Sequence, residues 1–372
     1  MSSDGRPRPI LLMVRKLDIG GCERDLTKIA TGLDRSRFEP HVGCFQAQGL
    51  RAGELQAAAI PIVELPVRSI VSTGGLRGAW EMIRYIHRNR IELVHAFDVP
   101  TDMFGVPVAR AAGTRVVISS QLSYRHLYSE KERHLLRITD RMVDKILVNC
   151  RAVRKHLIED ERVDPERIYL SYNGVDTAIF HPRATERPVE VKGAALVIGT
   201  VANLRVEKGL DLLIEAFAKL GDLRRGMKLA IVGHGPLEAE LKAQARELGI
   251  EDACIFEPGR PDVADWMRSI DIFVSPSRSE SFSNSLLEAM ASGCMVVGSA
   301  VGGTPELITE GRTGLLFRVG DVADLTRALG TAIRDETTRE RMARAAASFA
   351  SENLGVEKAV ERAHELYGTL LA

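Results

Sequence analysis

Two glutamates with seven residues between them are the part of this sequence that best predicts chemistry. Glu280 and Glu288 follow the apolar run Ile272–Ser275, and this pattern predicts a buried strand, a short loop and a helix that opens at Ser283. Such a helix directs its free backbone N–H groups and the positive end of its dipole beyond the strand, where phosphate is the natural occupant. Ser283 and Glu288 would lie roughly 7–8 Å apart along the helix axis, a distance comparable to part of a nucleotide sugar. Glu280 and Glu288 could therefore accept hydrogen bonds from hydroxyls on opposite sides of a diphosphate.

Two cations precede this motif in a loop that could face the same phosphate. Arg205 and Lys208 follow the apolar run 197–201 and lead into a helical stretch at 210–220. They could neutralise a diphosphate leaving group without a metal ion. An Asp-x-Asp pair that would hold magnesium does not stand at a predicted strand end, so neither a metal nor another cofactor is expected. Alone, the two cations would indicate a solvated loop, but their position before the carboxylates favours a role in binding.

The elements that position these residues alternate between short apolar runs and longer amphipathic stretches. The first series of predicted strands runs from 9–14 to 167–170 and the second from 195–201 to 314–317, with a proline- and charge-rich stretch at 181–192 between them. This alternation predicts an α/β fold with two doubly wound Rossmann-like domains, 1–174 and 175–372, facing across a cleft. We expect the last helix, about 356–372, to pack back on the first domain. Ligands in such sheets bind outside the carboxyl ends of the strands.

Glycine-containing turns follow three of the predicted strands. They are Gly20-Gly21, Gly233-His-Gly235 and Gly302-Gly303. Glycine allows close approach of a ligand and positive φ, although tight strand-to-helix turns use glycine in any case. Their shared position at strand carboxyl ends favours ligand binding.

Composition restricts the class of protein. With 372 residues and 45% hydrophobic content, the chain can build two cores. Lys plus Arg equals Asp plus Glu at 50 each, so no net charge favours a nucleic-acid partner. Five cysteines without paired spacing indicate neither disulfides nor zinc and fit a reducing cytoplasm. The sequence shows neither a signal peptide nor an apolar run of the roughly 18–20 residues that a membrane span needs. We therefore expect a cytoplasmic protein, at most peripheral at the inner membrane face.

The ordered series of motifs resembles glycosyltransferase family 4, the retaining nucleotide-sugar transferases of GT-B architecture that are also called glycosyl transferases group 1. The resemblance covers nearly the whole chain and is densest from Ile198 to Phe317. It is carried by Gly20-Gly21-Cys22-Glu23, Tyr172–Asp176, Phe180–Pro182, Lys208-Gly209, Gly233–Pro236, Glu280–Gly293 and Gly302–Glu306.

The resemblance implies a role for each donor-side residue. Glu280 would hold sugar hydroxyls and Glu288 ribose hydroxyls, while Lys208 would bind the diphosphate. The segment from Glu257 to Arg260 would contact the base through backbone groups and stacking. The donor-binding candidates are Gly20, Gly21, Asn203, Arg205, Lys208, Gly233, Gly235, Arg260, Glu280, Ser281, Phe282, Ser283, Asn284, Ser285 and Glu288.

Two positions depart from the family pattern. Asn203 stands where an arginine is common, so Arg205 would supply the charge from a shifted position. Gln121 stands where a histidine often lies near the acceptor, and glutamine cannot take a proton. Either His95 or Asp98, at another predicted strand end, then assists, or the departing phosphate accepts the proton. The catalytic candidates are Glu280, Lys208, Arg205, His95 and Asp98, and the acceptor-side candidates are His95, Asp98, Gln121 and Arg125.

The segment 123–145 combines basic and apolar side chains. It could rest on anionic lipid head groups or bind an acidic saccharide. Four acidic residues dilute its charge, which favours an ordinary amphipathic helix.

Together with the residues above, the resemblance implies metal-independent transfer of a sugar, with retention, from a UDP- or GDP-linked donor to a carbohydrate or lipid-linked saccharide acceptor, as in cell-surface polysaccharide or glycoconjugate synthesis. The C-terminal domain would bind the donor and the N-terminal domain the acceptor. Two alternatives stay open. A catalytically silent nucleotide-sugar-binding protein of the same fold would fit the departures at Asn203 and Gln121. An NAD-dependent dehydrogenase would need Gly-x-Gly-x-x-Gly, and the nearest match, 233–238, lacks the third glycine.

Overall fold

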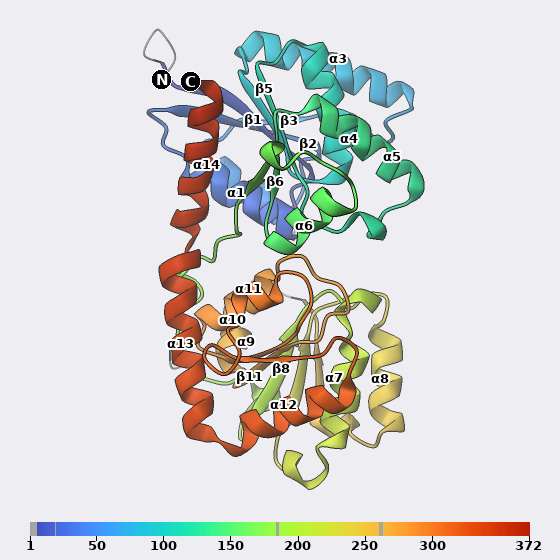
Figure 1. Ribbon diagram of the computed structural model, residues 1–372, viewed down its shortest axis with the longest axis vertical. Coiled ribbons are helices and arrows are strands. Elements are labelled where there is room, and N and C mark those ends of the chain that lie inside the picture. Colours follow the sequence, from blue (N-terminus) through green and yellow to red (C-terminus); the bar gives the residue numbers. More distant parts are fainter. Residues whose placement is uncertain (1–5, 19, 184–185, 260–262) are drawn as a thin grey trace. The chain divides into compact units, whose positions relative to one another are not determined.

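The computed structural model describes residues 6–18, 20–183, 186–259 and 263–372, which form two compact units (Figure 1). Unit 1 contains the described residues up to Gly174 together with Val356–Ala372, and unit 2 is Val175–Gly355. Each unit is built on one parallel β-sheet flanked by helices. The α/β class and the two parallel sheets expected from the sequence are confirmed.

Unit 1 has a seven-stranded sheet in the order β3-β2-β1-β4-β5-β6-β7. All neighbouring strands pair in parallel, so their carboxyl ends meet at one edge. The strands are β1 (Arg8–Lys16), β2 (Phe38–Gln46), β3 (Ile62–Glu64), β4 (Leu93–Ala96), β5 (Val116–Ser120), β6 (Lys145–Val148) and β7 (Ile168–Leu170).

The helices of unit 1 cover both faces of this sheet. Helices α1 and α14 pack together against one face, and α3, α4 and α5 pack in sequence on the other (Figure 1). The last helix completes the core, because Tyr367 and Leu371 are buried with Ile10, Leu26 and Phe38. The bounds are α1 (Gly21–Gly32), α2 (Leu50–Ala57), α3 (Thr73–Asn89), α4 (Val99–Ala111), α5 (Glu130–Met142), α6 (Arg151–Glu159) and α14 (Val356–Leu371).

Unit 2 has a six-stranded parallel sheet in the order β10-β9-β8-β11-β12-β13. Strands β8 and β11 are neighbours although 70 residues separate their ends, which brings the loops after them together. The strands are β8 (Val197–Val201), β9 (Lys228–Val232), β10 (Cys254–Glu257), β11 (Ile272–Ser275), β12 (Met295–Ser299) and β13 (Leu315–Phe317). The helices are α7 (Leu210–Lys219), α8 (Glu238–Glu247), α9 (Ala264–Ser269), α10 (Asn284–Ala291), α11 (Thr304–Leu307), α12 (Val322–Arg334) and α13 (Glu336–Leu354).

No helix within the described ranges is both long enough and apolar enough to cross a bilayer.

Candidate active site

The amino end of α10 lies at the carboxyl edge of the unit 2 sheet. Strand β11 ends at Ser275, and α10 begins after Ser283, whose hydroxyl oxygen accepts a hydrogen bond from the Leu286 amide at 3.3 Å. This N-cap confirms the helix start expected from the sequence. The first backbone N–H groups of α10 therefore point beyond the strand ends, toward the place where an anion is stabilised.

Lys208 and Glu280 meet in front of this helix. The lysine ammonium donates to one Glu280 carboxylate oxygen at 2.6 Å, and the Ser277 hydroxyl donates to the same oxygen at 3.2 Å. Both side chains line a cavity of about 20 Å³ together with Ser283 and Ser285 at the helix terminus. The loops after β8 and β11 thus bring a cation, a carboxylate and a helix terminus to one place.

Two contacts hold these loops against each other. Gly209 adopts φ 63°, and a Cβ built on it would lie 2.2 Å from the Pro276 carbonyl oxygen. The Arg278 guanidinium donates to both carboxylate oxygens of Asp211, at 2.6 and 2.5 Å. This hydrogen bonding holds the pKa of the Asp211 carboxyl below its ordinary value. The sequence did not predict this pair, because neither residue belongs to a motif. The one feature that could have indicated it is that Asp211 and Arg278 carry opposite charges and stand close in sequence to Lys208 and Glu280, respectively.

The Gly302-Gly303 turn after β12 holds the backbone that carries Glu280. Gly302 adopts φ 56°, and a Cβ on it would lie 1.7 Å from the Glu280 carbonyl oxygen. The Gly303 amide donates to the Ser281 carbonyl at 2.6 Å. These glycines are therefore required for close backbone packing at the site.

The Gly233–Gly235 turn after β9 supports the loop before Lys208 in the same way. Gly233 adopts φ 150°, and a Cβ on it would lie 1.9 Å from the Ala202 carbonyl oxygen. A Cβ on Gly235 would lie 2.5 Å from the Leu204 carbonyl oxygen. The turn therefore fixes the chain between β8 and Lys208.

The remaining donor-side candidates of unit 2 differ in how far they are exposed to solvent. Asn203 and Arg205 are exposed, and the Arg205 guanidinium lies 4.0 Å from a Glu207 carboxylate oxygen rather than lining the cavity with Glu280. Phe282 and Glu288 are buried, at 5% and 3% exposure. Ser281 and Asn284 lie beside them in the loop and the first turn of α10, whereas Arg260 lies outside the described residues.

In unit 1, His95 lies inside the protein. The ring is fully buried in β4, with Nδ1 2.7 Å from the Tyr367 hydroxyl of α14 and Nε2 2.8 Å from the Ser120 hydroxyl. Burial lowers the pKa of His95 to about 3. Both ring nitrogens are thus engaged by protein partners, and the ring is neutral at physiological pH.

Asp98 caps helix α4. One carboxylate oxygen accepts from the Thr101 amide at 3.0 Å and its hydroxyl at 2.7 Å, and the other accepts from the Arg15 amide at 2.8 Å. Burial raises the pKa of this carboxyl above its ordinary value. Both oxygens already accept protein hydrogen bonds.

Gln121 and Arg125 form a buried polar cluster with α5. The Gln121 amide group donates to an Asp140 oxygen at 2.6 Å, and its own carbonyl oxygen accepts from the Arg125 guanidinium at 2.6 and 3.0 Å. Arg125 also pairs with Asp140 at 2.7 and 2.8 Å and is 1% exposed. The cluster fixes the loop after β5 through paired charges.

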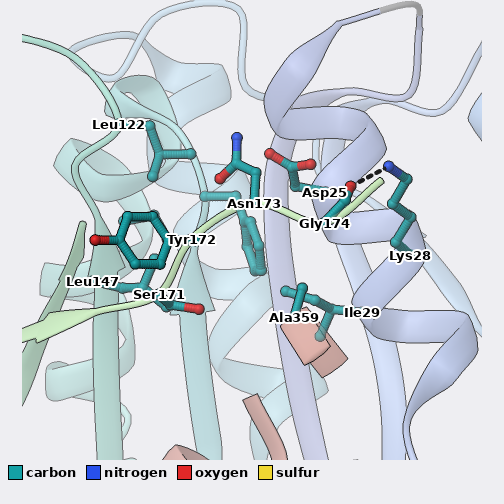
Figure 2. A pocket seen from close by; sticks show the side chains of 12 residues that line it. Asp25, Lys28, Ile29, Leu122, Leu147, Ser171, Tyr172, Asn173, Gly174 and Ala359 are labelled. Atoms are coloured by element: carbon teal, nitrogen blue, oxygen red, sulfur yellow. Dashed lines mark hydrogen bonds between the residues drawn. The ribbon is translucent and has the colours of Figure 1, made fainter. Parts of the chain in front are cut away.

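Gly20 and Gly21 begin α1 in unit 1. Gly20 is the N-cap, and a Cβ on it would lie 2.1 Å from a Glu23 carboxylate oxygen. About two turns further along the helix, the Lys28 ammonium donates to the Gly174 carbonyl at 2.7 Å (Figure 2). A small cavity of about 30 Å³ lies there, and Figure 2 labels Asn173 and Gly174 among the residues that line it.

A much larger cavity opens at the carboxyl ends of β1, β2 and β3. Its volume is about 1240 Å³, and its lining includes Arg15 and Lys16 of β1, Gln46 of β2, Glu64 of β3 and Arg68. Parallel α/β sheets bind ligands at this edge. Sequence reasoning missed these residues, although their positions at the ends of predicted strands could have indicated them.

Comparisons with known proteins identify the family. Residues 183–349 match Glycosyl transferases group 1, and residues 19–179 match Glycosyltransferase Family 4. A D-inositol 3-phosphate glycosyltransferase of Corynebacterium glutamicum is 31% identical over 75% of this chain and 72% of its own length. The protein of the same name from Kribbella flavida is 35% identical over 56% of this chain, which spans 52% of that relative.

The fold matches as well. The structure of Anabaena Alr3699/HepE in complex with UDP-glucose is similar with a TM-score of 0.84 and 23% identity, covering 97% of this chain and 99% of that one. The expected resemblance is thereby confirmed across both units, and the chain belongs to the group 1 glycosyl transferases of glycosyltransferase family 4.

Proposed function

We propose that this protein transfers a hexose or related sugar, with retention of configuration, from a nucleoside diphosphate sugar to a saccharide or lipid-linked saccharide acceptor. The observation that carries the proposal is the arrangement of Lys208, Glu280 and the α10 terminus around one cavity. A lysine and free backbone amides suit a diphosphate, and a carboxylate beside them suits sugar hydroxyls. The UDP-glucose complex of the Anabaena neighbour supports a UDP-linked donor.

We assign the donor to unit 2 and the acceptor to unit 1. Unit 2 holds the anion-binding arrangement. Unit 1 offers a cavity of about 1240 Å³, a volume that accommodates a saccharide. The D-inositol 3-phosphate in the name of the relatives belongs to those proteins, and the acceptor proposed for this chain is a saccharide or its lipid-linked form.

The proton of the acceptor hydroxyl most readily goes to the departing phosphate. In the reaction, a bond forms between the acceptor oxygen and the anomeric carbon, and the bond from that carbon to the β-phosphate oxygen breaks. His95 is neutral with both nitrogens engaged, and both Asp98 oxygens accept protein hydrogen bonds. A phosphate oxygen that gains charge during the reaction is the better acceptor.

A ligand screen followed by turnover tests this proposal. Thermal unfolding across nucleoside diphosphates and their sugars should identify one base, because ligand at 100 times its dissociation constant adds about 2.7 kcal/mol to native stability. With that donor and a panel of saccharides, the wild type should release free nucleoside diphosphate, and Glu280→Gln should not. Stabilisation without release in either protein would indicate the silent binding protein. Stabilisation by NAD, with hydride transfer, would indicate the dehydrogenase.

A further inference from the structure

One face of helix α3 in unit 1 exposes apolar side chains to solvent. Leu76 is 75% exposed and Trp80, one turn later, is 56% exposed. Val71, in the turn before the helix, is 97% exposed. Helix α3 is labelled in Figure 1, and its opposite face packs on α4 through the buried Met82 and Ile86. Apolar side chains this exposed and this close together usually mark an interaction surface.

The turn before the helix holds its apolar residues outward. The Ser72 hydroxyl donates to the Ser69 carbonyl at 2.7 Å and accepts from the Gly75 amide at 3.2 Å. A Cβ on Gly75 would lie 2.2 Å from the Ile70 carbonyl oxygen, so glycine permits this tight packing. Ile70 and Val71 therefore project from an ordered turn.

Arginines surround these apolar residues. Residues 66–90 contain five arginines and one acidic residue, Glu81. Arg77, Arg84 and Arg88 are exposed on the same face as Leu76 and Trp80, since they follow one another at helical spacing. The Arg84 guanidinium lies 4.4 Å from the Trp80 ring centroid. The face is thus apolar along its axis and strongly cationic at its sides.

We propose that this α3 face, formed by Val71, Leu76, Trp80, Arg77, Arg84 and Arg88, docks on a bilayer surface that carries anionic lipids. Tryptophan and leucine partition into the interface between head groups and acyl chains, and arginines pair with lipid phosphates from its water side. A helix of 17 residues is about 25 Å long, and one face of it offers far less than the roughly 800 Å² per partner that a stable protein complex buries. The charge and the size of the face both favour a membrane over a protein.

The face borders the large cavity of unit 1. Arg68, Ser69 and Ile70 line that cavity and immediately precede Val71. Docking of α3 would therefore place the cavity rim at the lipid head groups, where a lipid-linked saccharide is available.

Helix α5, which the sequence offered as the lipid-binding segment, has the weaker face. Its exposed Leu135 and Ile138 are 43% and 42% exposed. The helix carries three acidic and four basic residues, and Arg137 pairs with Glu161 at 2.8 Å. Its charge is nearly balanced, so α5 provides a matched control surface in the same unit.

Vesicle binding with tryptophan fluorescence tests the proposal directly. Of the two tryptophans, Trp80 is exposed and Trp266 is 3% exposed in unit 2, so a shift of the emission reports on α3. Vesicles of phosphatidylcholine with phosphatidylglycerol should bind the full-length protein and shift its emission to shorter wavelength, and bromine-labelled lipids should quench it. Vesicles of phosphatidylcholine alone should do neither, and added salt should weaken binding to the anionic vesicles.

Variants of the two helices separate the surfaces. Arg84→Ser with Arg88→Ser should weaken binding to anionic vesicles by about 25-fold, because each arginine contributes about fivefold near such a surface. Leu135→Ser with Ile138→Ser in α5 should leave it unchanged. Melting temperature and stabilisation by nucleoside diphosphate should match the wild type in both. Equal binding to neutral vesicles, an unshifted Trp80 emission, or loss of binding in the α5 variant alone would each overturn the proposal.

Discussion

Replacing Gly302 by alanine should disable the donor site through a backbone clash. Gly302 has φ 56°, where a side chain costs roughly 1–2 kcal/mol. Its new Cβ would lie 1.7 Å from the Glu280 carbonyl oxygen, whereas real Cβ contacts essentially never fall below 3.0 Å. The loop must therefore retreat by about 1.3 Å, and a displacement of about 1 Å at a reacting group can cost 100-fold in rate. We expect nucleoside diphosphate release to fall by at least about 100-fold.

Gly320→Ala is the matched control for this prediction. Gly320 has φ 76° in the same unit, and a Cβ on it meets nothing within 4 Å. It should show the same backbone cost in thermal unfolding but keep its release rate within about twofold. The rate is measured from released nucleoside diphosphate, and donor affinity by calorimetry. If Gly302→Ala retained the activity of Gly320→Ala, the glycine would not position Glu280, and the reasoning would be refuted.

Three further predictions concern charge and burial. Lys208→Ala should weaken nucleoside diphosphate binding by about 10- to 100-fold in calorimetric titration, because a charge-assisted hydrogen bond is lost. Arg205→Ala should change the affinity by less than about twofold, because the Arg205 side chain is 61% exposed. Equal losses of affinity in the two variants would contradict the assigned geometry. Asp211→Asn should lower the free energy of unfolding at neutral pH by less than about 1 kcal/mol, because the ion pair is over one-third exposed. Since the folded pKa of Asp211 is depressed, this difference should be present above pH about 3.9 and disappear in stronger acid, and its persistence there would exclude a charge effect. His95 has a folded pKa of about 3, so between about pH 6.5 and 3 it binds a proton only in the unfolded state. The free energy of unfolding of the wild type should therefore fall as the pH is lowered through that range, by up to about 1.4 kcal/mol per pH unit. His95→Gln should flatten this decline, and an unchanged slope would show that His95 does not cause it.

Local signals explain why the arrangement at the amino end of α10 could be predicted from the sequence. The apolar run at β11 and the serine that caps α10 act over a few residues, and both are visible as patterns. Lys208 and Glu280 are 72 residues apart, yet both follow strands, and the rule that parallel strands share a carboxyl edge brings their loops together.

Contacts that depend on loop conformation or distant packing could not be predicted. His95 lies in a short strand as expected, but its environment is set by Tyr367, which lies 272 residues away in the last helix. The pattern around His95 contains no trace of that partner. Likewise, the pairing of Arg278 with Asp211 depends on how two loops fold against each other, which periodicity does not determine. The sequence alone could not predict that Trp80 is exposed, because buried apolar residues such as Met82 stand close to it in the same helix.

The Lys208–Glu280 pair would keep a cation in place at the proposed donor site before a phosphate arrives. The Lys208 ammonium is 26% exposed and the Glu280 carboxylate 10%, so the cost of removing both charges from water offsets much of their mutual attraction. A diphosphate brings at least two negative charges and also accepts bonds from the amino end of α10, so it can draw the lysine toward itself at small cost. Glu280 then has an oxygen available for a sugar hydroxyl, while the Gly302 contact keeps its backbone in position. In the proposed reaction, the same ion pair would orient the lysine without donor and would free the carboxylate when donor binds, which is what preorganised electrostatic stabilisation of a departing diphosphate requires.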